Sequence, residues 1–400
     1  MSNELMHDVV VVGGGTAGIT VAARLKRAGI KDVAIIEPSE DHYYQPLWTL
    51  VGGGQSKAAD SVRPQANLIP KGQTWIKDSA TAVDPDSNTV TLASGKTVKY
   101  KWLVMAAGIQ LNWSKISGLP EALGKNNIST NYRFDLTDYT WKAIQDTKSG
   151  VAVFSMPAGP IKCAGAPQKI AYLAADYWRK QGTLKVIDVH MVLPTPGMFG
   201  VPEFAATLTE VVKRYGIQVH FESEVIAVDT NTNDITIRHN PTGDTKVLKA
   251  AMAHITPPQS APDWIANSPI ADPNNAFGYV EVDKHTLQHS RYANIFGLGD
   301  CTTTPNSKTG AAIRKQAPVL VANLVAARAS KPATKSYDGY ASCPLITGVN
   351  KCVMAEFNYE LKRTPTFPVL DMTKERYDMY MVKKHGLPLM YWNFMLKGRA

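Results

Sequence analysis

Apolar segments near the start of the chain follow two spacings, one typical of strands and one typical of helices. Residues 8–12 are a short β-branched run, and residues 33–36 and 102–106 are two further continuously apolar runs. Between the first two, residues 16–28 place apolar side chains at helical spacing and end before Gly29. Strands that are apolar at nearly every position are typical of a parallel sheet covered by helices on both faces, so we predict an α/β fold.

A second unit with the same alternation begins near Gly150. Residues 151–154 predict a strand, and residues 167–181 predict a helix that has Pro167 in its first turn and ends at Gly182. Further strands are expected at residues 186–192, 218–221, 235–238, 246–248 and 293–297, and a long helix at residues 311–328. The sequence therefore predicts two doubly wound, Rossmann-like units.

Composition places the chain among ordinary folded proteins. Of its 400 residues, 44% are hydrophobic and 19% are charged, which excludes a disordered, collagen-like or disulfide-dense secreted chain. The four cysteines include no C-x-x-C pair, so we expect neither a thioredoxin-type motif nor a zinc site, and we predict no metal. Few, scattered thiols suit a reducing compartment.

The chain is basic, and its positive charge is concentrated near the C-terminus. The net charge is +9, and residues 331–400, with 11 basic and 6 acidic side chains, contribute +5 of it. This concentration favours a local role over a diffuse basic surface, and we predict no nucleic-acid partner. The first eight residues show no basic presequence pattern. No uncharged apolar run reaches the roughly 18–20 residues that span a bilayer, so any membrane contact is expected to be peripheral.

A glycine-rich loop follows the first predicted strand and opens the first predicted helix. It holds Gly13, Gly14, Gly15 and Gly18, and Glu37 stands 19 positions after the last of these. In a dinucleotide-binding unit such glycines permit a tight turn, close approach of the backbone to the pyrophosphate, and close helix–strand packing. The helix N-terminus favours phosphate, and the acid binds the ribose hydroxyls. We therefore predict a dinucleotide site; a glycine-rich βα turn without a ligand is the alternative.

Two later segments indicate which dinucleotide binds. Asp300 follows the predicted strand at residues 293–297, where flavoproteins with two dinucleotide domains place an acid on the ribityl chain of FAD. Ala106-Ala107-Gly108 supplies the crossing point between the two units. We therefore predict FAD. The alternative role for Asp300 is a helix N-cap, and the two roles are compatible.

The loop after residues 151–154 differs from a nicotinamide-binding loop. Flavoproteins with two dinucleotide domains that oxidise NAD(P)H carry a second Gly-x-Gly-x-x-Gly at this position. This chain instead has Pro157 and Pro160, which restrict φ and remove N–H donors. NAD(P)H binding is therefore disfavoured. The loop instead presents Cys163 just ahead of a helix.

Cys163 has neighbours that favour a reactive thiolate. It lies next to Lys162 and about one turn before a helix N-terminus, and both features lower a thiol pKa. An inert buried thiol is the alternative. Cys343 lies 180 positions away, so only the fold could bring the two together, and spacing alone leaves their pairing open. Cys301 is expected to be a packed small residue, and Cys352 to lie in a strand-like segment.

Several strings in the chain resemble one family of flavoproteins. They are Tyr44-Gln45-Pro46-Leu47-Trp48-Thr49-Leu50-Val51-Gly52, Lys162-Cys163-Ala164-Gly165-Ala166-Pro167-Gln168-Lys169, Gly299-Asp300-Cys301, Ser307-Lys308-Thr309 and Ser342-Cys343-Pro344-Leu345. The chain closely resembles the sulfide:quinone oxidoreductases, in the branch that includes the mitochondrial enzyme, nearly from end to end. One departure is Gly310, where relatives have alanine beside the flavin.

The resemblance implies a set of functional residues and a domain layout. The two redox cysteines fall on Cys163 and Cys343. The FAD contacts fall on Gly13, Gly14, Gly15, Gly18, Glu37, Gln45, Ala80, Gly108, Asp300, Lys308, Thr309 and Gly310. Residues 1–110 and 291–330 would form the FAD-binding domain, residues 111–290 a second Rossmann-like domain with Cys163, and residues 331–400 a C-terminal region with Cys343 and an interfacial tail.

The resemblance also implies the reaction. Hydrosulfide attacks the Cys163–Cys343 bridge, a persulfide forms on Cys343, and Cys163 passes two electrons to FAD. The electrons then reduce a membrane quinone of the ubiquinone type, and the persulfide sulfur leaves to a small sulfur acceptor. Three rival functions are a type-II NADH:quinone oxidoreductase, a flavin-containing persulfide carrier without quinone turnover, and a non-enzymatic membrane adaptor.

Residues 386–396 are expected to contact a membrane. This aromatic stretch has basic flanks, and an 11-residue helix is only ~16 Å long, too short for a ~30 Å bilayer core. The pattern fits an interfacial anchor, which would make the protein a peripheral component of a bacterial or mitochondrial inner membrane. A helix packed on the protein core, or in a homodimer interface, is the alternative. Phe357, Tyr391 and Phe394 are candidates for lining a quinone channel.

Basic side chains near these motifs are candidates for attracting an anionic substrate. They are Lys162, Lys308 and Lys315, each of which is at least as well explained as a solvated surface lysine. His42 is expected to be a structural histidine.

Overall fold

The apolar runs of the N-terminal region form the centre of a seven-stranded sheet. In the computed structural model, which describes residues 4–400, the strands follow the order β5 (Thr74–Ile76), β2 (Val33–Ile36), β1 (Glu4–Val12), β8 (Thr97–Met105), β7 (Thr89–Leu92) and β6 (Ala80–Asp84), and β18 (Ile295–Gly297) also pairs with β8. The pairings of β1, β2, β5, β8 and β18 are parallel, and β7 joins β6 and β8 through antiparallel pairings. A strand from residue 295 onward thus returns to the first sheet.

Alternate side chains of β1 enter two different cores, which explains why the strand is apolar throughout. Val9 and Val11 pack with residues of α1 (Thr16–Arg27) and α8 (Gly310–Arg328), whereas Val10 and Val12 pack on the opposite face of the sheet. All four side chains are at most 3% exposed. Burial on both faces is the usual state of a parallel sheet, as the sequence pattern predicts.

The second sheet repeats this topology with different strands. Its order is β13 (Gln218–His220), β12 (Ile187–Val192), β11 (Gly150–Ser155), β16 (Thr245–His254), β15 (Asp234–His239) and β14 (Ser223–Val228), and β10 (Ile128–Ser129) also pairs with β16. The helices of this domain include α4 (Thr137–Asp146), α5 (Ala166–Gln181) and α6 (Pro202–Tyr215). The prediction of two Rossmann-like domains is therefore confirmed.

The helix ends follow the local sequence. Pro167 lies in the first turn of α5, where a missing N–H costs nothing, and Gly182 ends the helix in the left-handed conformation at φ +75°. Gly216 ends α6 in the same way at φ +66°. The predicted strand at residues 186–192 is one residue shorter, because a 3₁₀ turn at Leu184–Val186 precedes β12.

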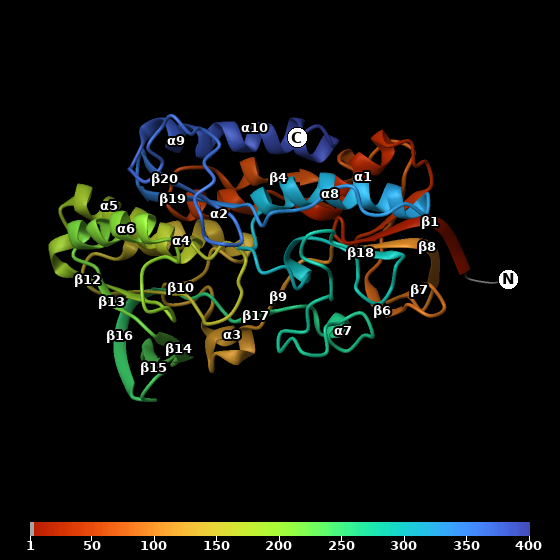
Figure 1. Ribbon diagram of the computed structural model, residues 1–400. Coiled ribbons are helices and arrows are strands. Elements are labelled where there is room, and N and C mark those ends of the chain that lie inside the picture. Colours follow the sequence, from red (N-terminus) through yellow and green to blue (C-terminus); the bar gives the residue numbers. More distant parts are fainter. Residues whose placement is uncertain (1–3) are drawn as a thin grey trace.

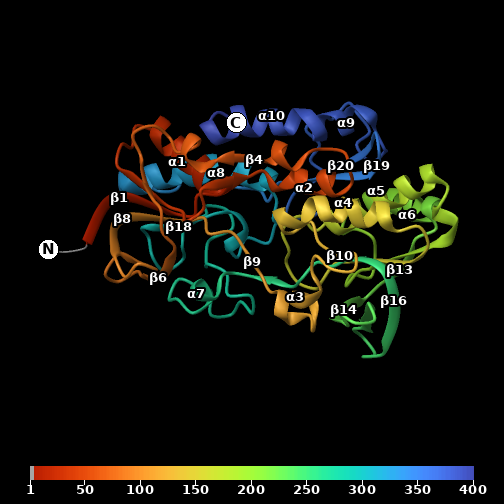
Figure 2. The same ribbon diagram turned by 180° about the vertical axis from the view of Figure 1, so that it is seen from behind.

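The C-terminal region lies across both domains. Its hairpin of β19 (Ala341–Gly348) and β20 (Lys351–Phe357) is followed by α9 (Tyr377–Met381), a π-helical turn (Val382–Gly386) and α10 (Leu387–Asn393). Figures 1 and 2 show this blue segment along one side of the molecule, running from the β19–β20 hairpin toward α1.

Short elements complete the chain. They are β3 (Asp41–Tyr43), α2 (Trp48–Gly52), β4 (Val62–Pro64), β9 (Gln110–Leu111), α3 (Leu119–Ala122), β17 (Gln259–Ser260) and α7 (Asp263–Ala266). Among residues 4–400, no helix combines the length and the hydrophobicity needed to cross a membrane. Residues 1–3, at the start of the stretch inspected for a presequence, lie outside the described part.

Candidate active site

Two cysteines from distant parts of the sequence meet beside α5. Cys163 lies in the loop between β11 and α5, Cys343 lies on β19, and the two thiols are close enough to shift each other's pKa. Both are free thiols in this structure, and Cys343 is 2% exposed. Gly165 makes room for the contact, because a Cβ there would lie 2.5 Å from Cys343 Sγ. The fold thus supplies the juxtaposition that sequence spacing left open.

The backbone around Cys163 holds the residue in an unusual conformation. Its φ is +52°, in the left-handed region that non-glycine residues rarely adopt. Its N–H donates to the Lys308 carbonyl over 2.9 Å, and its own carbonyl accepts from the Ala166 N–H over 2.8 Å. The Tyr132 hydroxyl also donates to the Cys163 carbonyl over 3.3 Å. Strain that is fixed by surrounding bonds is typical of functional sites.

Lys169 places a buried ammonium group on Cys163. The lysine lies in the first turn of α5, is 2% exposed, and donates from Nζ to Cys163 Sγ over 3.1 Å. The hydrogen bond from Cys343 and the charge of Lys169 lower the pKa of Cys163 well below its ordinary value, although burial opposes this. The hydrogen bond to Cys163 and burial raise the pKa of Cys343. Cys163 is therefore the thiolate of the pair and Cys343 the thiol.

A second buried lysine reaches the site from the C-terminal region. Lys383 is 1% exposed, and its Nζ donates to the Pro46 carbonyl over 2.7 Å. Burial and repulsion from Lys169 lower the pKa of Lys383 to about 8, and its charge also stabilises the Cys163 thiolate. Two buried cations thus lie near a thiolate that is itself only partly buried.

Neither of these lysines is predicted from the sequence as part of the site. Lys169 stands in the cysteine string, and the available signal was its position six residues after Cys163 and within the first helical turn. Lys383 was treated as a basic flank of the tail, because no pattern in the sequence shows that it is buried. Lys162, the expected cation, has its Nζ 5.7 Å from the ring centre of Trp48, and its charge still interacts with Cys163.

The role of Lys315 in attracting an anionic substrate stays a prediction. The residue is exposed on α8, and its Nζ lies 5.4 Å from the ring centre of Tyr340. Lys308 is 6% exposed and donates to the Thr302 carbonyl over 3.0 Å. Burial lowers the pKa of Lys308, and Asp300 opposes this effect.

The glycine loop after β1 is shaped as the motif requires. A Cβ on Gly13, where φ is +103°, would collide with the Ala106 carbonyl oxygen, and a Cβ on Gly18 would collide with the Gly13 carbonyl oxygen. Gly15 is different, because a Cβ there would project into open space at the start of α1. The Gly14 N–H donates to Glu37 Oε2 over 2.7 Å, so the acid lies directly beside the loop.

The segment around Asp300 presents a second group of binding features. Asp300 Oδ1 is buried without a hydrogen-bond partner, and burial raises the pKa of this carboxyl against the attraction of Lys308. Thr309 caps α8, since its Oγ1 accepts from the Ala312 N–H over 3.2 Å. A Cβ on Gly310 would meet no atom within 4 Å, and the same holds for Gly108 after β8.

These observations fit the predicted FAD. An open glycine at a helix N-terminus suits a pyrophosphate, an acid beside the loop suits ribose hydroxyls, and a buried unpaired carboxylate oxygen needs a donor such as a ribityl hydroxyl. Gln45 and Ala80 stay predictions as FAD contacts. Gln45 is exposed before α2, and Ala80 begins β6, four residues after Ile76, whose carbonyl accepts from the Glu37 N–H over 3.0 Å.

The three aromatic residues suggested for a quinone channel do not gather in one place. Phe357 packs against Phe199 in the second domain's core, with ring centres 5.6 Å apart, whereas Tyr391 is buried in the first domain's core. Phe394 is 47% exposed. The channel prediction is therefore wrong for this set of residues.

The C-terminal tail combines a packed face with an exposed one. Tyr391, Met395 and Leu396 are each at most 3% exposed and belong to the first domain's core. Leu389 is 60% exposed, and Phe394 also faces outward. The packed helix that the sequence analysis held as an alternative is thus present, and it still leaves apolar side chains on the surface.

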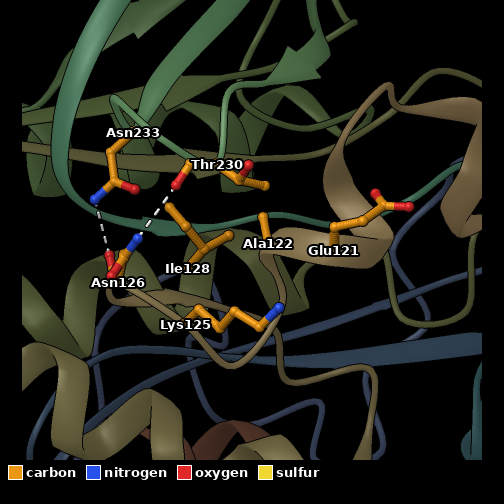
Figure 3. Close-up of a pocket in the computed structure, with 7 residues that line it drawn as sticks. All are labelled: Glu121, Ala122, Lys125, Asn126, Ile128, Thr230 and Asn233. Carbon is orange, nitrogen blue, oxygen red and sulfur yellow. Dashed lines mark hydrogen bonds between the residues drawn. The ribbon is translucent and has the colours of Figure 1, made fainter.

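A separate hollow of about 240 Å³ lies between the α3 region and the loop joining β14 to β15. Figure 3 shows its lining, in which Asn126 donates to the Thr230 carbonyl over 3.3 Å and Asn233 donates to the Asn126 carbonyl over 3.0 Å. None of the predicted site residues lines it. The hollow is therefore distinct from the sulfur pair and the glycine loop.

Comparisons with known proteins point to a family. A model of the pyridine nucleotide-disulphide oxidoreductases matches residues 7–317. The mitochondrial sulfide:quinone oxidoreductases of Mus musculus and Dictyostelium discoideum are 44% and 42% identical to this chain, and the alignments cover 98% of the chain and 87% and 86% of the relatives. The chain belongs to the sulfide:quinone oxidoreductase family.

A solved structure of this family has the same fold. The crystal structure of the sulfide:quinone oxidoreductase from Aquifex aeolicus matches with a TM-score of 0.83 at 22% identity, over 98% of this chain and 92% of that chain. Sulfide:quinone oxidoreductases are FAD-binding flavoproteins, so the protein is an FAD-dependent oxidoreductase. The predictions of family, enzyme class and cofactor are confirmed.

Proposed function

We propose that the protein oxidises hydrosulfide with Cys163 and Cys343 as its redox pair and delivers the electrons, through FAD, to a membrane quinone. The observation that carries this proposal is the contact between two thiols that are far apart in the sequence. One of them, Cys163, also accepts a hydrogen bond from the Lys169 ammonium. The names of the relatives supply the two substrates, sulfide and quinone.

The difference between the two cysteines assigns their roles. In the oxidised protein, hydrosulfide forms a bond with one sulfur while the bond between the cysteine sulfurs breaks. The sulfur with the lower pKa is the better leaving group. Because Lys169 and Cys343 stabilise a thiolate at Cys163, Cys163 leaves and the persulfide forms on Cys343.

The remaining steps restore the starting state. The outer persulfide sulfur leaves to a small nucleophilic acceptor, so Cys343 becomes a thiolate. The two thiolates then lose two electrons as their bond re-forms. FAD, when bound, accepts electron pairs of this kind and passes them with protons to the quinone. The glycine loop, Glu37 and Asp300 would hold it.

The charges of the two buried lysines favour an anion at the sulfur pair. Lys169 and Lys383 are each at most 2% exposed, so their charges act on the sulfurs with little screening by water. With a pKa near 8, Lys383 can hold or release a proton at Nζ around neutral pH. We assign Lys169 to thiolate stabilisation and Lys383 to proton exchange with incoming hydrosulfide.

The exposed face of the tail supplies the contact with the quinone-bearing membrane. Leu389 and Phe394 project from the surface, and Lys397 and Arg399, also exposed, follow them closely. Apolar side chains with basic neighbours suit the interface of an anionic lipid surface. We assign the protein to the surface of an inner membrane, the mitochondrial one in view of the named relatives.

The redox pair is tested by turnover with sulfide and a soluble quinone analogue. Cys163→Ser and Cys343→Ser should each lower turnover by about 10³-fold or more while the flavin absorbance of the purified protein stays unchanged. Cys352→Ser is the matched control, because this buried thiol lies on β20, the other strand of the hairpin that carries Cys343, and its replacement should leave turnover intact. Full turnover in either of the first two variants would contradict the proposal.

The membrane surface is tested by sedimentation with vesicles that contain an anionic phospholipid. Leu389→Ser combined with Phe394→Ser should weaken binding about ten-fold, because two apolar side chains leave the interface. Val247→Ser removes an equally exposed apolar side chain, 56% exposed, from β16 of the second domain and should have no effect. Equal binding by the unmodified protein, the double variant and Val247→Ser would exclude this face as the anchor.

A further inference from the structure

A buried chain of hydrogen bonds joins the C-terminal segment to the glycine loop. Tyr391 Oη on α10 lies 2.8 Å from Thr16 Oγ1, at the first residue of α1, and 2.6 Å from His42 Nε2. His42 Nδ1 lies 3.2 Å from the Gly14 carbonyl and 3.0 Å from Gln65 Oε1. A residue near the end of the chain thus contacts the loop that opens the first domain.

The acceptors around His42 fix the direction of these bonds. Nδ1 faces two oxygens that can only accept, so it carries the hydrogen and donates. Nε2 must then accept, and the Tyr391 hydroxyl donates to it. Because its own hydrogen is used, Tyr391 Oη accepts from Thr16. The donor and the acceptor of each bond are therefore fixed. Loss of the Tyr391 hydroxyl would leave both His42 Nε2 and Thr16 Oγ1 without this partner.

The Gly14 peptide group is held from both sides. Its carbonyl accepts from Gln65 Nε2 over 2.8 Å as well as from His42, and its N–H donates to Glu37. His42 is 2% exposed, and burial lowers its pKa to about 4, so the ring is neutral at physiological pH and its bonds do not change there.

The aromatic surroundings hold Tyr391 in place independently of its hydroxyl. Its ring centre lies 4.4 Å from that of Tyr44 and 4.9 Å from that of Trp392. Farther along, Arg24 of α1 donates to the backbone oxygen of Ala400. Figures 1 and 2 show the end of the chain, beyond α10, approaching α1. A Tyr→Phe change would therefore remove the hydroxyl without removing the packing.

We infer that His42 and Tyr391 are positioning residues for the phosphate-binding loop, so that the C-terminal segment is a structural part of the FAD site. They would not touch the flavin. They set the orientation of Gly14 and Thr16. Gly15, which lies between these two residues, stands at the open N-terminus of α1 that would face the pyrophosphate. The inference depends on FAD binding and is independent of the sulfur chemistry.

The test is the affinity of the flavin-free protein for FAD and for ADP, which shares the pyrophosphate. Tyr391→Phe should weaken the binding of both about ten-fold. Tyr380→Phe is the control, because this tyrosine is also buried on the tail but donates to Gln55, away from the loop. It should bind both ligands as the unmodified protein does.

Further variants separate positioning from general stability. His42→Gln should weaken ADP binding similarly, and the double variant should be no weaker than the stronger single variant, because both changes break one chain of bonds. Unchanged ADP and FAD affinity in Tyr391→Phe, with only a lower melting temperature, would overturn the inference. Neither readout requires sulfide, so a failure here and a failure of the proposed function are distinguishable.

Discussion

The two domains use the same strand–loop–helix unit in opposite ways. In the first domain, the three residues 13–15 join β1 to α1, and they are all glycines. In the second, the ten residues 156–165 join β11 to α5 and include two prolines and Cys163. The short loop offers backbone N–H groups and an open helix end, whereas the long loop offers one side chain.

The start of each helix shows why the functions cannot be exchanged. Gly15, at the N-terminus of α1, is exposed and faces open space. At the start of α5, Ala166 and Pro167 are buried, and the proline lacks an N–H. The N-terminus of α5 therefore provides no phosphate-binding site. A thiolate lies just ahead of it and is stabilised by Lys169 from its first turn.

The largest expected effect on FAD affinity is in the first loop. Gly18→Ala would place a methyl group against the Gly13 carbonyl oxygen, where backbone must move. We expect FAD affinity to fall about 10- to 100-fold, because overpacking costs about 1–3 kcal/mol. Fluorescence titration of the flavin-free protein measures it. Wild-type affinity would show that this loop does not hold the cofactor.

The corresponding change in the second loop should leave FAD bound. In Gly165→Ala the new Cβ would lie 2.5 Å from Cys343 Sγ and 2.6 Å from Leu345 Cδ2. We expect the rate of flavin reduction by sulfide to fall about 10-fold or more. The added methyl group would overpack this contact and push the two sulfurs apart. Gly197→Ala, also in the second domain and with open space around it, is the matched control. Loss of FAD instead would remove the contrast between the loops.

A smaller effect is expected at Lys169. A lowered pKa means that the Cys163 thiolate persists below the ordinary thiol range and is lost only as the pH falls through that lowered value. Lys169→Met should raise this pKa, so the pH below which alkylation of Cys163 slows should move upward by the same amount. Lys180→Met, at the exposed end of the same helix, should not change the rate. An unchanged pH profile in Lys169→Met would exclude the ion pair as the cause of thiolate stability.

The smallest effect on the chemistry is expected where the β19–β20 hairpin is anchored. Glu375 accepts two 2.7 Å bonds from Arg214 and also accepts from Thr347 of β19. Although burial opposes it, these bonds lower the Glu375 pKa. Their stabilisation is therefore present above the ordinary glutamate range and lost as the pH falls below it. Glu375→Gln should reduce the free energy of unfolding at pH 7 by about 1–3 kcal/mol.

Chemical denaturation at pH 7 and at pH 4 measures this contribution. The difference between the variant and the unmodified protein should shrink at the lower pH, while FAD binding is unchanged. A difference that grows on acidification would contradict the assigned direction of the Glu375 pKa shift.

Much of the fold was predictable because local patterns determine it. The strand at residues 33–36 has the predicted bounds, and Gly182 ends α5 as expected. The glycine motif fixed the position of a helix N-terminus through spacing alone. These features depend on neighbours within about 20 positions, which a sequence displays directly.

The parts that could not be predicted depend on long-range packing. No periodicity shows that Lys383 is buried next to Lys169, or that Tyr391 reaches His42 across 349 positions. Lys162 stands next to Cys163 in the sequence, which makes it the evident candidate for the cation. The first turn of α5 instead brings Lys169, six residues after Cys163, to the sulfur. Family resemblance, and not spacing, supplied the partnership with Cys343.

The central claim is that the second loop replaces nicotinamide binding with a pair of sulfurs. Rapid mixing of the FAD-loaded protein with sulfide, and separately with NADH, tests it through the visible absorbance of the oxidised flavin. We predict rapid bleaching by sulfide that is lost in Cys163→Ser and in Cys343→Ser, and little response to NADH. Bleaching by NADH alone, or bleaching by sulfide that survives both substitutions, would contradict the account.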